Sequence, residues 1–242
     1  MNKLAWRWCA VAGLATLAVA ATFGRVPGLV PCAPSGEAMT GGGGAMIALE
    51  LARSAADVTT LFGSEPCRSA LIAGQRQALW LDMLAFIPAY AVFLLSAVVA
   101  LRRSGLGLAM LGLNLVMIAA TLDLLEGAIL FRILAEFPGG ERQFTGLFWM
   151  ARPKFALLAL AEVLLATMLW RGAAVAKVAA GIMAAGGVVA LAYLFRAPHD
   201  PAMMRGHMLA WGALLVVAAI GALRPGVLGL NPASAAVSSV ET

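Results

Sequence analysis

The sequence predicts an all-α fold: a polytopic bundle of six transmembrane helices, with both termini in the cytoplasm and an amphipathic helix on the outer surface. Hydrophobic residues make up 62% of the 242 residues and charged residues only 12%, whereas soluble domains average about 45–50% and about 25%. The apolar residues gather in stretches of roughly 20 residues, which is the length of a helix that crosses a bilayer. Lysine and arginine collect at alternate ends of these stretches, as they do in multi-pass proteins.

The composition also limits the class of function. The net charge of +5 comes from residues at the ends of the predicted helices, so it does not indicate binding to nucleic acid. The three cysteines, Cys9, Cys32 and Cys67, form no CxxC pair, and the chain has two histidines. These counts exclude a Cys/His zinc or iron–sulfur site.

Residues 1–23 predict the first transmembrane helix. Lys3 and Arg7 precede an apolar run that begins at Cys9. The tripeptide Ala18-Val19-Ala20 also fits a signal-peptidase cleavage site, so a secretory signal sequence is the alternative. Both interpretations place the next segment outside the cytoplasm, and we favour a retained helix.

Residues 24–78 form the predicted extracytoplasmic loop. Within it, Ala45–Phe62 places apolar and charged residues at helical spacing, which predicts an amphipathic helix on the outer surface. Cys32 and Cys67 both fall in this oxidising compartment, where disulfides persist. A disulfide between them would close a loop of roughly 35 residues and stabilise the fold by about 3–4 kcal/mol on the chain-entropy account. Two free thiols are the alternative.

Residues 79–223 carry the other five predicted spans. Each is an apolar stretch bounded by charged residues or turns: Leu79–Leu101, Gly105–Leu134, Leu147–Trp170, Ala173–Phe195 and His207–Leu223. Pro88 is expected to bend the first of these helices. Small residues in the fourth are expected to allow close contact with a neighbouring helix: Gly181, Ala185, Gly186 and Ala190. Residues 224–242 are rich in alanine and serine and predict a disordered cytoplasmic tail.

The positive-inside rule orients the chain. The predicted cytoplasmic segments are short and carry the basic residues Lys3, Arg7, Arg102, Arg103, Arg171, Lys177 and Arg224, whereas the opposite loops carry mixed charge. Six spans leave both termini inside, and five spans remain if the first is cleaved. We therefore expect a multi-pass protein of a bacterial inner (plasma) membrane, with membrane lipids and a partner membrane protein as its partners and no nucleic acid.

Charged residues inside the predicted spans mark the candidate site. Asp123 and Glu126 lie one helical turn apart, so their carboxyl groups share a face. With the predicted orientation, several polar residues of neighbouring helices reach the same slab of the outer leaflet, roughly 10–15 Å deep. The loop segment could add one more acid from above. The candidate polar cluster consists of Glu50, Asp82, Tyr90, Asp123, Glu126, Arg152 and Lys154.

This cluster permits a structural and several functional interpretations. Charges inside a membrane usually pair with one another, so the cluster could serve only to fix the register of the helices. The acids outnumber the bases, however, so one carboxyl is expected to be protonated or to bind something, because like charges raise each other's pKa.

The leading functional interpretation is a non-enzymatic component that binds a hydrophobic ligand or a partner helix at the cluster. The first alternative is an enzyme acting on an outer-leaflet lipid, with Asp123 and Glu126 as acid and base and Lys154 or Arg152 holding an anionic head group. The second is an ion- or proton-coupled carrier. The sequence leaves open whether the protein is an enzyme and assigns no cofactor.

A second constellation occupies the segment Arg196–Met208. It contains His199, Met203, Met204, His207 and Met208, and two of its pairs have the i, i+4 spacing of a helix face. Thioether and imidazole groups together form a soft donor set that suits Cu(I). A copper-binding membrane protein is therefore a further alternative, and ordinary interfacial methionines are the simpler explanation.

Part of the chain resembles an uncharacterised family of small polytopic bacterial inner-membrane proteins. The resemblance rests on E-L-A at Glu50, L-D at Asp82, D-x-x-E at Asp123 to Glu126, and K-F at Lys154. It spans about residues 45–170. No activity is known for the family, so the resemblance implies only that these five charged residues belong together. The family pattern often has asparagine after the glutamate, where this chain has Gly127.

Overall fold

The computed structural model describes residues 3–32, 34–40, 44–102 and 105–230, and within them every regular element is a helix. The helices are α1 Lys3–Phe23, α2 Pro34–Thr40, α3 Ala45–Glu50, α4 Ala55–Phe62, α5 Cys67–Leu81, η1 Asp82–Phe86, α6 Ile87–Leu101, α7 Leu106–Ala135, α8 Glu141–Leu169, α9 Ala174–Arg196, α10 Pro201–Leu223 and η3 Pro225–Leu228. The prediction of an all-α fold is confirmed.

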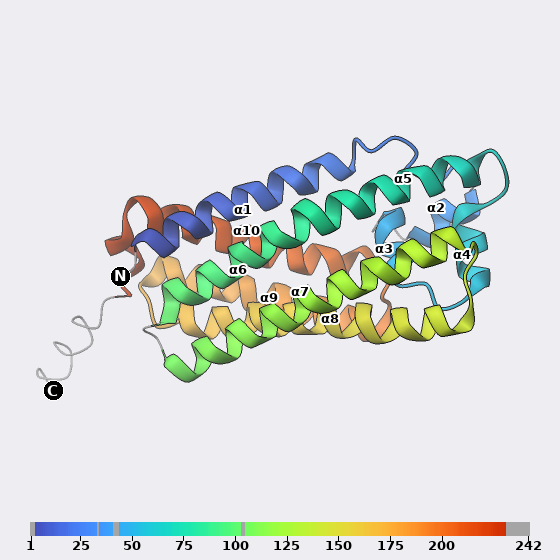
Figure 1. Ribbon diagram of the computed structural model, residues 1–242. Helices are drawn as coiled ribbons and strands as arrows, with labels where there is room; N and C mark the ends of the chain where they lie inside the picture. The colour runs from blue at the N-terminus through green and yellow to red at the C-terminus, as the bar shows by residue number, and fades with distance from the viewer. Residues whose placement is uncertain (1–2, 33, 41–43, 103–104, 231–242) are drawn as a thin grey trace, which may run out of the picture.

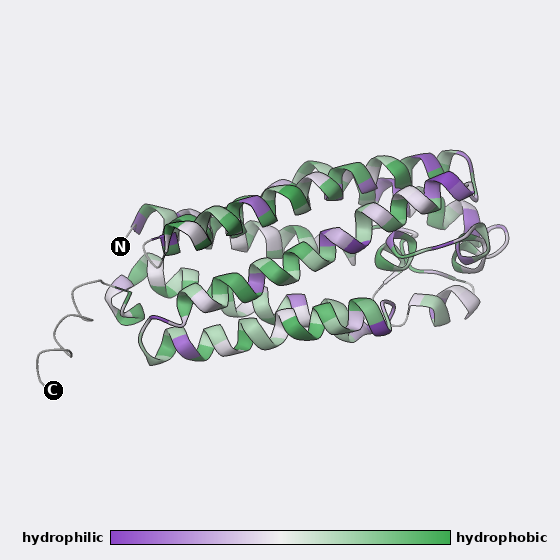
Figure 2. Cartoon of the chain, turned by 90° about the horizontal axis from the view of Figure 1, so that it is seen from below, coloured by the Kyte–Doolittle hydropathy of each residue, from purple (hydrophilic) through white to green (hydrophobic). Residues whose placement is uncertain are grey.

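The long helices run side by side in an elongated bundle, and the short helices α2, α3 and α4 gather at one end of it (Figure 1). Five helices are long and apolar enough to cross a membrane: α1, the continuous helix Cys67–Leu101, α7, α9 and α10. Hydrophobic residues lie along the length of these helices (Figure 2). The chain is therefore a multi-pass membrane protein.

The sixth long helix, α8, is not one of those five, although six spans were predicted. It is 29 residues long and carries Arg152, Lys154 and Glu162, all of which are buried inside the bundle. The same three charges lower the hydropathy of the helix. These charged side chains face protein and not lipid, because α8 packs against both α7 and α9. The low hydropathy of α8 therefore reflects its contacts with these two helices.

The second long helix begins at Cys67, well before the predicted start at Leu79. Its first part, α5, alternates buried apolar residues with polar ones, so it lacks the unbroken apolar run by which a span is recognised. A π-helical turn, η1, joins α5 to α6 immediately before Pro88, and the N–H of Ile87 donates to the carbonyl of Asp82. The wider turn accommodates a proline that has no N–H to donate.

The predicted amphipathic helix Ala45–Phe62 is two short helices, so that prediction was wrong. The chain turns after α3, and α4 starts afresh with Ser54 as its N-cap, accepting a hydrogen bond from the N–H of Asp57. The N–H of Arg53 donates in turn to the Asp57 carboxylate at 2.7 Å. The break turns the end of α3 inward, and Glu50 is buried there instead of lying on a surface.

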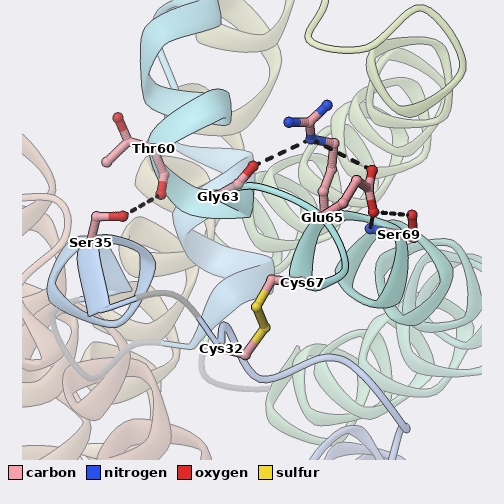
Figure 3. Close-up of a disulfide and its surroundings, with 8 residues drawn as sticks. Cys32, Ser35, Thr60, Gly63, Glu65, Cys67 and Ser69 are labelled. Carbon is pink, nitrogen blue, oxygen red and sulfur yellow. Dashed lines mark hydrogen bonds and ion pairs between the residues drawn. A yellow bond between two sulfur atoms is a disulfide. The ribbon is translucent and has the colours of Figure 1, made fainter.

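A disulfide between Cys32 and Cys67 ties the loop after α1 to the start of α5, with Cα atoms 5.6 Å apart (Figure 3). Nearby, the Ser35 hydroxyl donates to the carbonyl of Thr60 at 3.2 Å and so links α2 to α4. The Arg68 guanidinium donates to the carbonyl of Gly63 at 3.3 Å. These contacts tie α2, α4 and the start of α5 together at the end of the bundle.

The predicted disordered tail, residues 224–242, is ordered at its start. Residues Pro225–Leu228 form a 3₁₀ helix, and Leu228 is fully buried. The carbonyl of Leu228 accepts a hydrogen bond of 2.8 Å from the N–H of Ala173, at the start of α9. Residues 231–242 lie outside the described part of the chain.

Small residues bring α9 and α10 together, as predicted for Gly186 and Ala190. A Cβ at Gly206 would lie 2.5 Å from the carbonyl oxygen of Gly186 and 2.8 Å from the backbone nitrogen of Ala190. The other two predicted residues do not take part in this close contact. A Cβ at Gly181 would have its nearest neighbour at 3.9 Å, and Ala185 is exposed. Contact between the backbones thus requires glycine at Gly186 and Gly206.

Replacing Gly206 by alanine is expected to force α9 and α10 apart and to destabilise the protein by about 1–3 kcal/mol, as overpacking does. Gly212→Ala in the same helix is the control, because a Cβ there meets nothing within 4 Å. Thermal unfolding in detergent would measure both. Equal melting temperatures for the two variants would contradict the close contact.

Candidate functional site

The side chain of Lys154, in α8, lies among three carboxyl groups. Its ammonium nitrogen is 2.9 Å from Oε2 of Glu50, 3.0 Å from Oδ1 of Asp123 and 2.8 Å from Oε2 of Glu126. The same nitrogen is 4.3 Å from the ring centroid of Phe155. The ammonium donates hydrogen bonds to Glu50 and Asp123 and forms an ion pair with Glu126.

The three acids that contact Lys154 come from two helices, α3 and α7. Asp123 and Glu126 are one turn apart on α7 and face α8, whereas Glu50 is the last residue of α3 and reaches in from the end of the bundle. The hydroxyl of Tyr90, in α6, donates to the second carboxylate oxygen of Asp123 at 2.7 Å. Helices α3, α6, α7 and α8 are thereby joined at one point.

Asp82 completes the group. It is the first residue of the π-helical turn and is 7% exposed, and it lies close enough for the charges of Asp123, Glu50 and Lys154 to act on it without a described hydrogen bond or ion pair between them. Insertions of this kind in a helix occur frequently at functional sites. We refer to Glu50, Asp82, Tyr90, Asp123, Glu126 and Lys154 as the Lys154 cluster.

The Lys154 cluster holds more acid than base. It has four carboxyl groups and one ammonium, and all five charged residues are between 1% and 7% exposed. Burial raises the pKa of Glu50, against the opposing effect of the Lys154 ammonium and with a further rise from the Asp123 charge. A fully ionised cluster would place three uncompensated negative charges in the interior, which is expensive in a low-dielectric medium.

Arg152 does not belong to this cluster, in contrast to the prediction from the sequence. Its guanidinium donates to the carbonyl of Leu194 at 3.4 Å and lies 4.9 Å from the ring centroid of Phe148. No described carboxylate lies within ion-pair distance of it. The reason is helical geometry: residues two positions apart point to different sides of a helix, so Arg152 and Lys154 cannot face the same group.

A second buried polar group lies deeper in the bundle and was not predicted. Oε1 of Glu162 is 2.7 Å from Nδ1 of His207 and accepts a 2.6 Å hydrogen bond from the indole N–H of Trp211. The Trp211 ring lies 5.5 Å from that of Tyr90, which connects this group to the Lys154 cluster. The i, i+4 spacing of His207 and Trp211 and the i+8 spacing from Lys154 to Glu162 were the sequence signals that could have indicated it.

The residues proposed for copper do not all face the same environment, and a copper site stays a prediction. Nδ1 of His207 is occupied by Glu162. Met203 is fully buried, whereas Met208 is 69% exposed, so these two side chains face opposite environments. Met204 packs beside Met203, and His199 lies in the loop before α10. Among the described residues no group of three His, Cys, Asp or Glu could hold a metal ion.

No family model, no curated protein and no solved structure matches this chain. The five charged residues that carry the resemblance to small bacterial membrane proteins nevertheless meet in the Lys154 cluster: Glu50, Asp82, Asp123, Glu126 and Lys154.

Replacing Lys154 by methionine is expected to destabilise the protein by about 3–5 kcal/mol, because it removes the only ammonium among four buried carboxyl groups. Lys177→Met is the matched control, since Lys177 is exposed on α9, and a surface change of this kind stays within about 0.5 kcal/mol. Unfolding in detergent would compare the two. A Lys154→Met protein as stable as the control would show that the ion pairs contribute little.

Proposed function

We propose that this integral membrane protein takes up and releases protons at the Lys154 cluster, as a proton-coupled membrane component. The observation that supports the proposal most is the charge balance of the site: one ammonium contacts three buried carboxyl groups, and a fourth buried carboxyl group, that of Asp82, lies nearby. An electrically neutral cluster contains one carboxylate and three protonated carboxyl groups. Protons are the simplest cations that can supply this neutrality in a closed site.

The part of the protein that would respond to proton release is α3. Glu50 is held to the long helices through Lys154 and lies outside the membrane-spanning segments. Because its pKa is raised, the folded state holds this proton more tightly than the unfolded state does. The stability that Glu50 contributes is present at low pH and is lost as the pH rises through the pKa of Glu50 in the folded protein. Proton release would therefore loosen α3.

The deeper group extends the proton-binding region toward the middle of the bundle. Glu162 and His207 form a buried acid–base pair next to Trp211, whose ring contacts Tyr90 of the Lys154 cluster. Chains of carboxyl and imidazole groups inside a membrane are typical of proton relays. This arrangement favours a proton-coupled role over a site that only fixes helix register.

The other interpretations of the site require an opening through which a larger molecule can reach the Lys154 cluster. Glu50 and α3 cover Lys154, and the charged residues of the cluster are all buried. A hydrophobic ligand, a partner helix or a lipid substrate could reach the carboxyl groups only after α3 had moved. Binding of such a molecule, and lipid chemistry by Asp123 and Glu126, therefore receive less support from the geometry than proton binding does.

Protonated carboxyl groups give a C=O stretching band in the infrared that carboxylates lack. We expect the protein in detergent to show this band near neutral pH, to lose it as the pH rises, and to show a weaker band in Asp82→Asn and Glu126→Gln. Glu141→Gln is the control, because Glu141 is exposed at the start of α8. The absence of the band throughout about pH 5 to about pH 9, where free carboxyl groups are mostly ionised, would refute the proposal.

We also propose that α8 crosses a bacterial inner membrane as a sixth span, with both termini in the cytoplasm. Its length and its position between two apolar spans support this, and so does the basic charge of the segments on the predicted cytoplasmic side. The alternating ends of the bundle then place α2, α3 and α4 outside, together with the disulfide.

Reporter proteins fused to the chain at four different positions would test this topology. An alkaline phosphatase fused after Gly139 or Ala197 is expected to be active, and a green fluorescent protein fused after Arg102 or Gly172 is expected to fluoresce. The fusions at Gly139 and Gly172 together decide whether α8 crosses the membrane, because these two residues flank α8. The same reporter working at both positions would show that α8 does not cross.

A further inference from the structure

A second site lies at the end of the bundle that carries α2, α3 and α4, on the side of α8 that Lys154 does not face. Arg152 is 8% exposed, and its Nη2 nitrogen is buried and has no hydrogen-bond partner. Its other terminal nitrogen makes a single long hydrogen bond, 3.4 Å, to the carbonyl of Leu194. A buried guanidinium with a free donor is costly to maintain unless something accepts from it.

Two further basic side chains approach Arg152 from other segments. Arg53 comes from the turn between α3 and α4, and its positive charge acts on Arg152. His199 comes from the loop between α9 and α10 and senses the charges of both arginines. Nδ1 of His199 is also buried without a partner. Three basic groups from segments far apart in the sequence thus lie close enough for their charges to act on one another, and two of them have an unused polar atom.

Two acids lie near this site, and neither forms an ion pair with Arg152 among the described contacts. Asp57 acts on His199, but its Oδ2 already accepts the N–H of Arg53 at the start of α4. Glu141 lines a nearby pocket but forms no ion pair with Arg53 or Arg152 among the described contacts. Burial and the two arginines hold the pKa of His199 below its ordinary value, against the effect of Asp57. No described carboxylate therefore pairs with the Arg152 guanidinium, and its Nη2 nitrogen keeps a free donor.

A pocket of about 330 Å³ opens beside these groups. It is lined by Arg53, Glu141, Phe144, Thr145 and Phe148. The ring of Phe148 carries the Arg152 guanidinium on its face, with 4.9 Å between the guanidinium carbon and the ring centroid. Arg152 is thus positioned by stacking next to a pocket that also presents Arg53.

We propose that Arg53, Arg152 and His199 form a binding site for a phosphate group. A phosphate oxygen can accept from the free Nη2 of Arg152 and from Nδ1–H of His199, and Arg53 supplies a second guanidinium from the pocket wall. Guanidinium groups suit phosphate because their donors match the spacing of its oxygens. The phosphate could belong to a lipid head group or to a small soluble phosphate ester, and the chemistry of recognition is the same.

The site is distinct from the Lys154 cluster and does not depend on proton binding there. Arg152 and Lys154 are neighbours on α8 but point to different sides of the helix. The phosphate site collects basic groups, whereas the Lys154 cluster collects acidic ones. Because Arg152 and Lys154 share no contact partner, a variant of one site can be tested with the other intact.

Native mass spectrometry in detergent would test the proposal with two probes, phosphatidylglycerol and inorganic phosphate. We expect wild-type protein to retain at least one of them and not to retain a galactosyl diacylglycerol, which has no phosphate. Arg152→Gln and Arg53→Gln should each weaken retention about tenfold, the effect of losing one charged hydrogen-bond donor. Arg142→Gln is the matched control, because Arg142 is exposed near the start of the same helix.

The outcomes separate the two sources of phosphate. Retention of phosphatidylglycerol but not of inorganic phosphate would assign the site to a lipid head group, and retention of inorganic phosphate would assign it to a small anion. If Arg152→Gln fails to fold, Arg53→Gln still tests the proposal, because Arg53 is exposed and its replacement is expected to leave the fold intact. Retention of neither probe by the wild type, or equal retention by Arg53→Gln, Arg142→Gln and the wild type, would overturn the proposal.

Discussion

The arrangement of the bundle depends on a single ammonium group held by carboxyl groups in a medium that does not solvate charge. Lys154 can be buried only because Glu50, Asp123 and Glu126 surround it. Each acid can be buried only because Lys154 or a proton is present. The position of α3 and the mutual register of α7 and α8 follow from this requirement. The hydrogen bond from Tyr90 to Asp123 extends it to α6.

Helix α8 also carries Arg152, two residues before Lys154, and Arg152 has a different environment. Lys154 faces an excess of acid, whereas Arg152 stacks on Phe148 and meets further basic groups. We propose that the Lys154 cluster exchanges protons in the interior and that the Arg152 site accepts phosphate near the end of the bundle. The turn between α3 and α4 serves both, because it holds Glu50 over Lys154 and places Arg53 beside Arg152.

Much of the Lys154 cluster could be predicted from residue spacing. Asp123 and Glu126 share a face by their i, i+3 separation, and the direction of each span places Lys154 at the same depth. Arg152 was assigned to the wrong group because depth in the membrane was considered without angular position. Glu162 and His207 were missed as a pair because they lie on helices that are not consecutive, and only packing decides which of their faces meet.

The sequence by itself determined that the chain is helical and multi-pass, because the length and apolar character of a span are local properties of the chain. It also determined that charges must be paired inside, since hydrocarbon does not solvate them. The tertiary structure alone decided how they pair. It divided residues 45–62 into α3 and α4, turned Glu50 inward and separated Arg152 from Lys154. These choices depend on contacts between segments far apart in the chain, which spacing along one helix does not encode.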